Sequence, residues 1–140
     1  IEKLCEMVRV NVESTFRVAY LAVKHFRRVG RGHLINTSSV MGNKVRSHAG
    51  AYCGTKFAIE ALSEALRLEL ARSAIKVTVV QPGLTRTELH RHYPEEPWVA
   101  RNIPTPLVAE DVARTVIFAL RQPDHVLIPR LSIQPMDHEI

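Results

Sequence analysis

Apolar positions recur along the chain with two different spacings, and the spacings predict alternating helices and strands. Over residues 4–28 they recur at three- and four-residue steps, which places them on one face of a helix. These positions are Val8, Val12, Phe16, Ala19, Val23 and Phe26. Gly30 follows this run and predicts the end of the helix. The partly apolar run 33–38 follows a turn, and it predicts a short strand.

The longest helical pattern covers residues 51–72, and its apolar arc is wider than one surface stripe. The arc contains Ala58, Leu62, Ala65, Leu66, Leu68 and Leu70. Such a width predicts a helix that a sheet covers on one side and a second helix on the other. Glu60, Glu64 and Arg67 stand between these positions and predict the face that meets solvent.

The second half of the chain continues the alternation. Residues 76–81 are rich in β-branched side chains and predict a strand, which Pro82 and Gly83 end. A strand, a helix and a strand in this order predict a parallel βαβ unit. A helix over 109–121 and a last strand from Val126 to Ile133 complete an α/β layered fold.

Residues 84–107 contain several prolines and predict a long irregular segment, a type that often forms lids or binding loops. Its large side chains are candidates for the lining of a pocket. They are Leu89, His90, His92, Tyr93 and Trp98.

The composition is that of a globular chain and narrows the possible functions. The 140 residues suffice for one core, so we treat 1–140 as one domain. No apolar run reaches the ~18 residues of a membrane span. Cys5 and Cys53 form neither a disulfide framework nor a metal-ligand spacing, which favours a cytoplasmic chain without a metal site. The net charge of +5 invites nucleic-acid binding, but the basic residues are dispersed, so we expect no nucleic-acid or membrane partner.

Tyr52 and Lys56 lie four residues apart in the 51–72 pattern, which places them one turn apart on one helix face. A tyrosine with the ordinary pKa of about 10 is a poor acid or base at neutral pH. A cation one turn away stabilises the phenolate form. The same spacing occurs by chance in many helices, so the pair alone indicates no more than an exposed surface pair.

Other residues at fixed spacing around this pair resemble the short-chain dehydrogenase/reductase superfamily. Ser39 lies thirteen residues before Tyr52, which is the family's usual gap and favours Ser39 over Ser38. The resemblance runs from the start of the chain to the final strand. The matching residues are Asn11, Ser39, Tyr52, Lys56 and the stretch from Pro82 to Thr87.

This resemblance implies a Rossmann-like doubly wound parallel sheet, of which the chain is the C-terminal portion. It implies an oxidoreductase that transfers a hydride between NAD or NADP, with NADP slightly favoured, and an alcohol or carbonyl substrate. In the family, Tyr52 would exchange a proton with the substrate, and Lys56 would lower the pKa of that tyrosine and bind the nicotinamide ribose. Ser39 would hold the reacting oxygen, and Asn11 would hold a water in a proton relay. The implied cofactor-binding residues are Tyr52, Lys56, Pro82, Gly83, Leu84 and Thr87.

The chain departs from the family pattern in two ways. Gly54 and Thr55 stand where alanine and serine are common, and we expect little effect from either. The six glycines form no glycine-rich turn of the kind that cradles a pyrophosphate. We therefore expect a chain without the family's front half, with an exposed strand edge.

Three functions remain open at this point. The first is the oxidoreductase, the second is a truncated and inactive relative, and the third is an interaction or dimerisation module. The resemblance also implies a homodimer or homotetramer formed through the helices 4–28 and 51–72.

Overall fold

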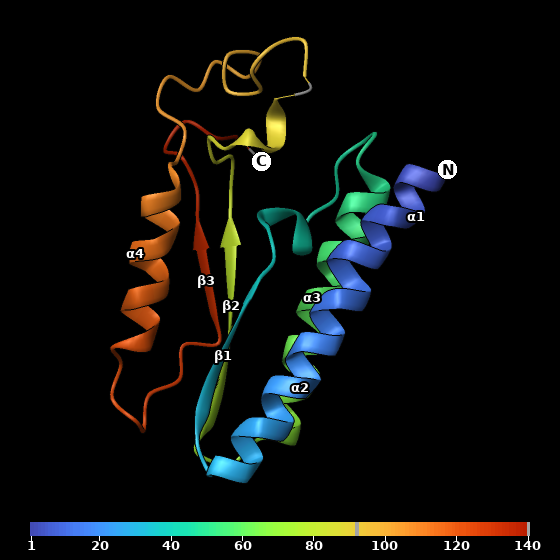
Figure 1. Cartoon of the computed structure of the whole chain (residues 1–140). Helices are drawn as coiled ribbons and strands as arrows, with labels where there is room; N and C mark the ends of the chain where they lie inside the picture. The colour runs from blue at the N-terminus through green and yellow to red at the C-terminus, as the bar shows by residue number, and fades with distance from the viewer. Residues whose placement is uncertain (92, 140) are drawn as a thin grey trace.

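A three-stranded parallel sheet lies between two helical layers in the computed structural model, which describes residues 1–91 and 93–139 (Figure 1). The strands are β1 (Gly32–Thr37), β2 (Ile75–Pro82) and β3 (Arg130–Ile133), in the order β1-β2-β3. β1 pairs with β2 in parallel, with Gly32 opposite Ile75. The parallel βαβ unit and the α/β fold predicted from the sequence are therefore confirmed.

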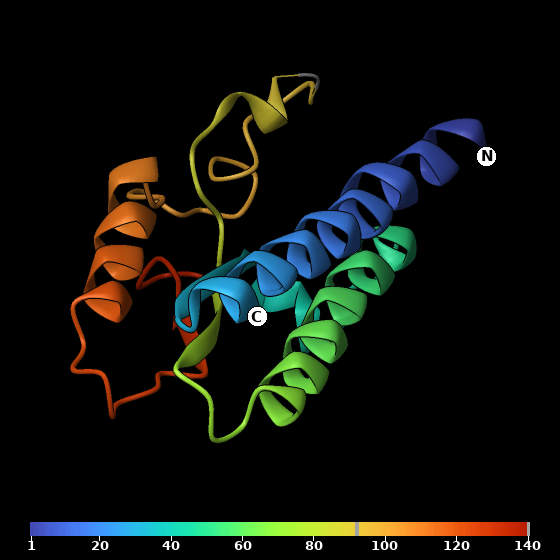
Figure 2. The same cartoon turned by 60° about the horizontal axis from the view of Figure 1, so that its bottom comes forward.

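Two long helical segments cover one face of the sheet. The first consists of α1 (Glu2–Val8), a π-helical turn η1 (Arg9–Glu13) and α2 (Ser14–Val29), which follow one another as a single rod. The rod lies beside α3 (Gly50–Glu69), as Figure 2 shows from a second direction. It ends at Gly30, whose φ of 80° is the left-handed conformation that glycine adopts without strain. The other face is covered by α4 (Ala109–Leu120).

The main core lies between the two long helical segments and the sheet. Ala19 of α2, Leu66 of α3 and Val77 of β2 are each at most 1% exposed. Phe16 and Phe26 pack against this core from the rod. The predicted apolar face of residues 4–28 is thus confirmed from Phe16 onward, whereas Val8 is 45% exposed.

β2 is the central strand, and its burial explains its β-branched sequence. Val77 to Gln81 are all buried, because helices cover both faces of the strand and a strand lies on each side. β1 pairs only with β2 among the described residues, so its other edge is unpaired.

Three sequence predictions are wrong in this part of the molecule. Glu60 is only 7% exposed, because its turn of α3 faces β2 rather than solvent. Leu68, which was assigned to the apolar arc, is 75% exposed. The last strand begins at Arg130 rather than at Val126, because residues 126–128 form no β-bridge, although the carbonyl oxygen of Pro129 accepts from the amide of Val79 at 3.1 Å.

The segment 84–107 closes on itself at its base, where Thr85 and Leu107 form a parallel bridge. It carries a short 3₁₀ turn η3 (Glu88–His90). His90 packs edge-on against Tyr93 and Trp98, with ring centroids 5.8 Å and 6.3 Å away. His92 lies outside the described residues.

A cavity of about 590 Å³ lies beside this segment, but it is not lined by the predicted residues Leu89, His90, Tyr93 and Trp98. Its walls come from the residues 105–107, from α4 and from the C-terminal residues 133–137. None of the helices formed by the described residues is both long and apolar enough to cross a membrane.

Candidate active site

Most of the predicted site residues gather where β1 and β2 end. Parallel strands end at one edge of the sheet, and open α/β sheets bind ligands at that edge. β1 ends at Thr37, two residues before Ser39, and β2 ends at Pro82. The segment 84–107 and the C-terminal residues also lie at this edge (Figure 1).

Tyr52 and Lys56 lie in the first turns of α3, as the spacing predicts. The Nζ atom of Lys56 is 5.7 Å from the centroid of the Tyr52 ring. The same ammonium donates a hydrogen bond of 3.2 Å to the carbonyl oxygen of Thr37, the last residue of β1. The lysine is therefore held between its own helix and the end of the strand.

Burial lowers the pKa of Lys56 from its usual value. The direction follows from the cost of moving a positive charge out of water. The ammonium is half-buried, and a positive charge in such a place stabilises a nearby anion.

Ser39 is buried and lies at the start of a 3₁₀ turn, η2 (Val40–Gly42). Its hydroxyl oxygen accepts a hydrogen bond of 3.2 Å from the amide of Met41, and the hydroxyl makes a long contact of 3.5 Å to the carbonyl oxygen of Pro82. Ser38 instead donates to the carbonyl oxygen of Lys56 at 3.3 Å. Tyr52 packs against the apolar cluster of η2 and Cys53, which brings the tyrosine close to the Ser39 turn.

Asn11 lies in the π-helical turn of the rod and connects the rod to α3. Its Nδ2 atom donates a hydrogen bond of 3.2 Å to the hydroxyl oxygen of Thr55. That hydroxyl donates to the carbonyl oxygen of Tyr52 at 2.7 Å. π-helical turns within α-helices are frequent at functional sites. The structure thus brings Asn11 to the residue next to Lys56.

Thr55 is a residue of the site that the sequence pattern does not predict. It is 2% exposed and its hydroxyl serves both Asn11 and Tyr52. The sequence does contain a signal for this role. Thr55 stands where the family commonly has serine, and both residues carry the hydroxyl that these contacts use.

The Pro82–Thr87 stretch leaves the sheet beside the C-terminal residues. The amide of Gly83 donates to the carbonyl oxygen of Ile133 at 2.7 Å. A Cβ atom on Gly83 would lie 2.8 Å from the Cβ atom of Gln134, so this close approach requires glycine. Leu84 accepts a backbone hydrogen bond from Leu107. Thr87 is exposed, and its hydroxyl oxygen accepts from the amide of Leu89 at 3.3 Å.

A family model for the short chain dehydrogenases matches residues 1–98. The chain belongs to the short-chain dehydrogenase family. The described residues of this short-chain dehydrogenase contain no group of three side chains suited to holding a metal ion.

Named relatives and solved structures agree with this family. Glycine betaine reductase ATRR of Emericella nidulans is 41% identical over 119 residues, which cover 79% of this chain and 9% of that protein. An uncharacterised oxidoreductase of Staphylococcus aureus is 32% identical over 130 residues, which cover 93% of this chain and 54% of the relative. The closed form of serine dehydrogenase complexed with NADP+ superimposes with a TM-score of 0.89 at 25% identity, over 99% of this chain and 58% of that one.

The short-chain dehydrogenase described here therefore spans about half the length of the Staphylococcus relative and a small part of ATRR. The Staphylococcus relative is named an oxidoreductase, and the structural neighbours share the Rossmann-type fold.

Proposed function

We propose that the full-length protein containing this chain transfers a hydride between NAD(P) and an alcohol or carbonyl substrate, with Tyr52 as the acid or base. One observation supports this role above the others. Lys56 lies 5.7 Å from the Tyr52 ring, and its half-buried ammonium is anchored to the end of β1. This is the arrangement that a tyrosine needs to carry negative charge during a proton transfer.

The residues present fit a nicotinamide cofactor by the chemistry of their donors. A lysine ammonium has three N–H donors, and Lys56 uses one of them for Thr37. The others suit ribose hydroxyls, while the Pro82–Thr87 stretch would lie beside the nicotinamide. When bound, the cofactor would accept or supply the hydride. We favour NADP slightly over NAD, because the similar serine dehydrogenase was solved with NADP+.

Each side chain has one task in this proposal. The phenol of Tyr52 gives its proton to the carbonyl oxygen of the substrate, or takes one from an alcohol. Lys56 stabilises the phenolate by its charge. The hydroxyl of Ser39 donates to the reacting oxygen and so stabilises the charge that develops there. Asn11 supports the start of α3 through Thr55 and would hold a water that returns protons to Lys56.

The test is turnover of the full-length protein with a panel of ketones, alcohols and hydroxy acids, followed by the absorbance of the reduced nicotinamide. Tyr52→Phe should lower kcat by about 10²–10⁴-fold, the usual contribution of a positioned acid or base. Tyr20→Phe is the matched control, since Tyr20 is a half-exposed tyrosine on α2 and is not one of the candidate site residues. Turnover that survives in Tyr52→Phe would refute the assigned role.

We also propose that the protein forms a homodimer or homotetramer through the rod and α3. Exposed apolar side chains occur on both, including Leu21 at 67% and Leu68 at 75%. Light scattering should give a multiple of the monomer mass, and Leu21→Asp combined with Leu68→Asp should reduce it. Leu89→Asp, which changes a 70% exposed leucine on η3, is the control. A monomeric parent protein would contradict this proposal.

Both cysteines are free in the structure, with Cys5 exposed and Cys53 buried. Free thiols fit our prediction of a reducing cytoplasmic location.

A further inference from the structure

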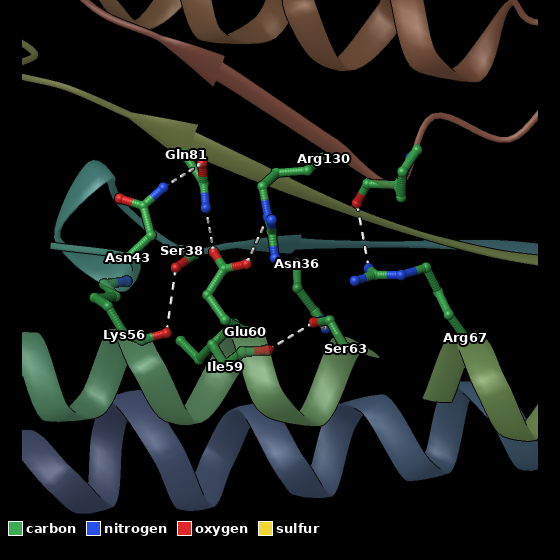
Figure 3. A network of polar contacts seen from close by, with 11 residues as sticks. Asn36, Ser38, Asn43, Lys56, Ile59, Glu60, Ser63, Arg67, Gln81 and Arg130 are labelled. Atoms are coloured by element: carbon green, nitrogen blue, oxygen red, sulfur yellow. Dashed lines mark hydrogen bonds and ion pairs between the residues drawn. The ribbon is translucent and has the colours of Figure 1, made fainter. Parts of the chain in front are cut away.

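Glu60 is a buried carboxylate at the centre of the polar network drawn in Figure 3. It lies one turn after Lys56 on the same helix and is 7% exposed. A buried carboxylate is costly unless charged or polar donors satisfy its oxygens. The hydrogen-bond donors to Glu60 therefore identify the segments that its side chain holds in place.

Each of its two oxygens has a donor from a different strand. The Nε2 atom of Gln81 donates to Oε1 at 2.9 Å, and the Nε atom of Arg130 donates to Oε2 at 3.2 Å. Gln81 is fully buried and immediately precedes Pro82. The carboxylate thus joins α3 to the end of β2 and to the start of β3.

The turn that carries Ser39 packs against the same side chain. A Cβ atom on Gly42 would lie 3.0 Å from Cγ of Glu60 and 2.4 Å from the hydroxyl oxygen of Ser38. The Nδ2 atom of Asn43 makes a 3.5 Å contact with Oε1 of Gln81. Close packing against glycine leaves the turn little freedom to shift relative to Glu60.

Glu60 therefore contacts, directly or through Gln81, the three segments that bear the candidate site. These are the helix of Tyr52 and Lys56, the turn of Ser39 and the strand end of Pro82. We propose that Glu60 is a positioning residue that fixes the Ser39 turn and the Pro82 strand end relative to Tyr52 and Lys56. The expected effect on catalysis rests on the proposed function, whereas the expected effect on the position of the Ser39 turn does not.

A carboxylate suits this task better than an amide of the same shape. It has two acceptor oxygens, and hydrogen bonds to an ionised acceptor are stronger than those between neutral groups. In Glu60→Gln, one oxygen can still accept from Gln81, but an NH₂ group would face Arg130. The substitution therefore keeps the volume and breaks one of the two connections.

The experiment compares Glu60→Gln with Glu64→Gln in the full-length protein. Glu64 is the matched control, because it is an exposed glutamate one turn further along α3. Glu60→Gln should lower kcat/KM by about 10- to 100-fold, since small misplacements of catalytic groups have effects of that size. Glu64→Gln should remain within about twofold of the parent, like a typical surface change.

A cycle with Ser39→Ala separates positioning from general loss of stability. If Glu60 acts through Ser39, adding Glu60→Gln to Ser39→Ala should lower kcat/KM by less than about threefold, because residues that act as a unit are not additive. A full 10- to 100-fold loss in the Ser39→Ala background would overturn the part of the inference in which Glu60 acts through the Ser39 turn.

Hydrogen exchange gives a readout that needs no activity. The amides of Met41 and Gly42 bond to the Ser39 hydroxyl and carbonyl, and they should exchange at least about tenfold faster in Glu60→Gln. The Leu34 and Val77 amides should be unchanged. Unchanged Met41 and Gly42 amides would overturn the inference even if Tyr52 proved not to be catalytic. Should Glu60→Gln fail to fold, Arg130→Gln is the second variant, since its side chain is 44% exposed, and it should show the same effects with smaller size.

Discussion

Replacing Thr55 with valine removes the hydroxyl that connects Asn11 to the carbonyl of Tyr52, and it preserves the shape of the side chain. Thr55 accepts from Asn11 at 3.2 Å and donates to Tyr52 at 2.7 Å. The position is 2% exposed, so water cannot replace the hydroxyl at that point. Thr55→Val is therefore a direct test of the connection between the rod and α3.

The expected loss follows from the two contacts. The Tyr52 carbonyl belongs to the α3 ladder and keeps its helical partner, so its lost contact contributes little. The Asn11 amide loses its acceptor but is only half-buried, which places its cost at the lower end of the range for unpaired groups. Together they should lower the free energy of unfolding by about 1–2 kcal/mol.

The assay is urea denaturation of the full-length parent, Thr55→Val, Asn11→Ala and the double variant. The two positions should show a coupling energy of about 1 kcal/mol, because each variant breaks the same hydrogen bond. Thr115→Val is the control, since its hydroxyl donates only to a carbonyl of its own helix α4, that of Asp111. Additivity of Thr55→Val and Asn11→Ala would refute the connection.

Two further predictions concern stability. Gly54→Ala should raise the free energy of unfolding by about 1 kcal/mol, since alanine favours a helix and the added Cβ atom meets nothing within 4 Å. Gly83→Ala should instead lower the free energy of unfolding, because its added Cβ atom would crowd the C-terminal residues. A stabilised Gly83→Ala would contradict the packing. Burial, together with Lys76, lowers the pKa of His33. The unfolded chain then binds the proton more tightly, so stability should fall as the pH drops from about 6.5 through that lowered pKa. In urea titrations at several pH values, His33→Gln should reduce this loss of stability at low pH. The control His25→Gln, at an exposed histidine, should not reduce it. An equal loss in the parent and both variants would disprove the assignment of the effect to His33.

The fold was largely predictable because the apolar periods are clear. The helices and most strands begin and end within a few residues of their predicted bounds, and Gly30 ends α2 as expected. The start of β3 was not predictable from hydropathy, since the segment from Val126 is as apolar as a strand. It joins the ladder only after Pro129, whose nitrogen has no hydrogen to donate.

The candidate site was predictable where sequence neighbours share an element and less so where distant segments meet. Tyr52 and Lys56 follow from one helical turn. Glu60 follows the same helical period, but in the sequence a glutamate on a buried helix face cannot be distinguished from one on a solvent-exposed face. Only the approach of Gln81 and Arg130, which come from two other elements, distinguishes them. The π-helical turn at Asn11 has no signal in the apolar pattern either.

The parallel pairing of β2 has a consequence for the order in which the chain folds. Its partners are distant in sequence, with Gly32 opposite Ile75 and Val79 opposite Arg130. Pairings of this kind close long loops and slow the search for the native topology. Among the described residues, the partner of β1 is β2, which is synthesised only after α3. Until β2 is synthesised, the side chains of the rod and α3 that pack against Val77 lack that contact, and exposed apolar surface of this kind favours aggregation.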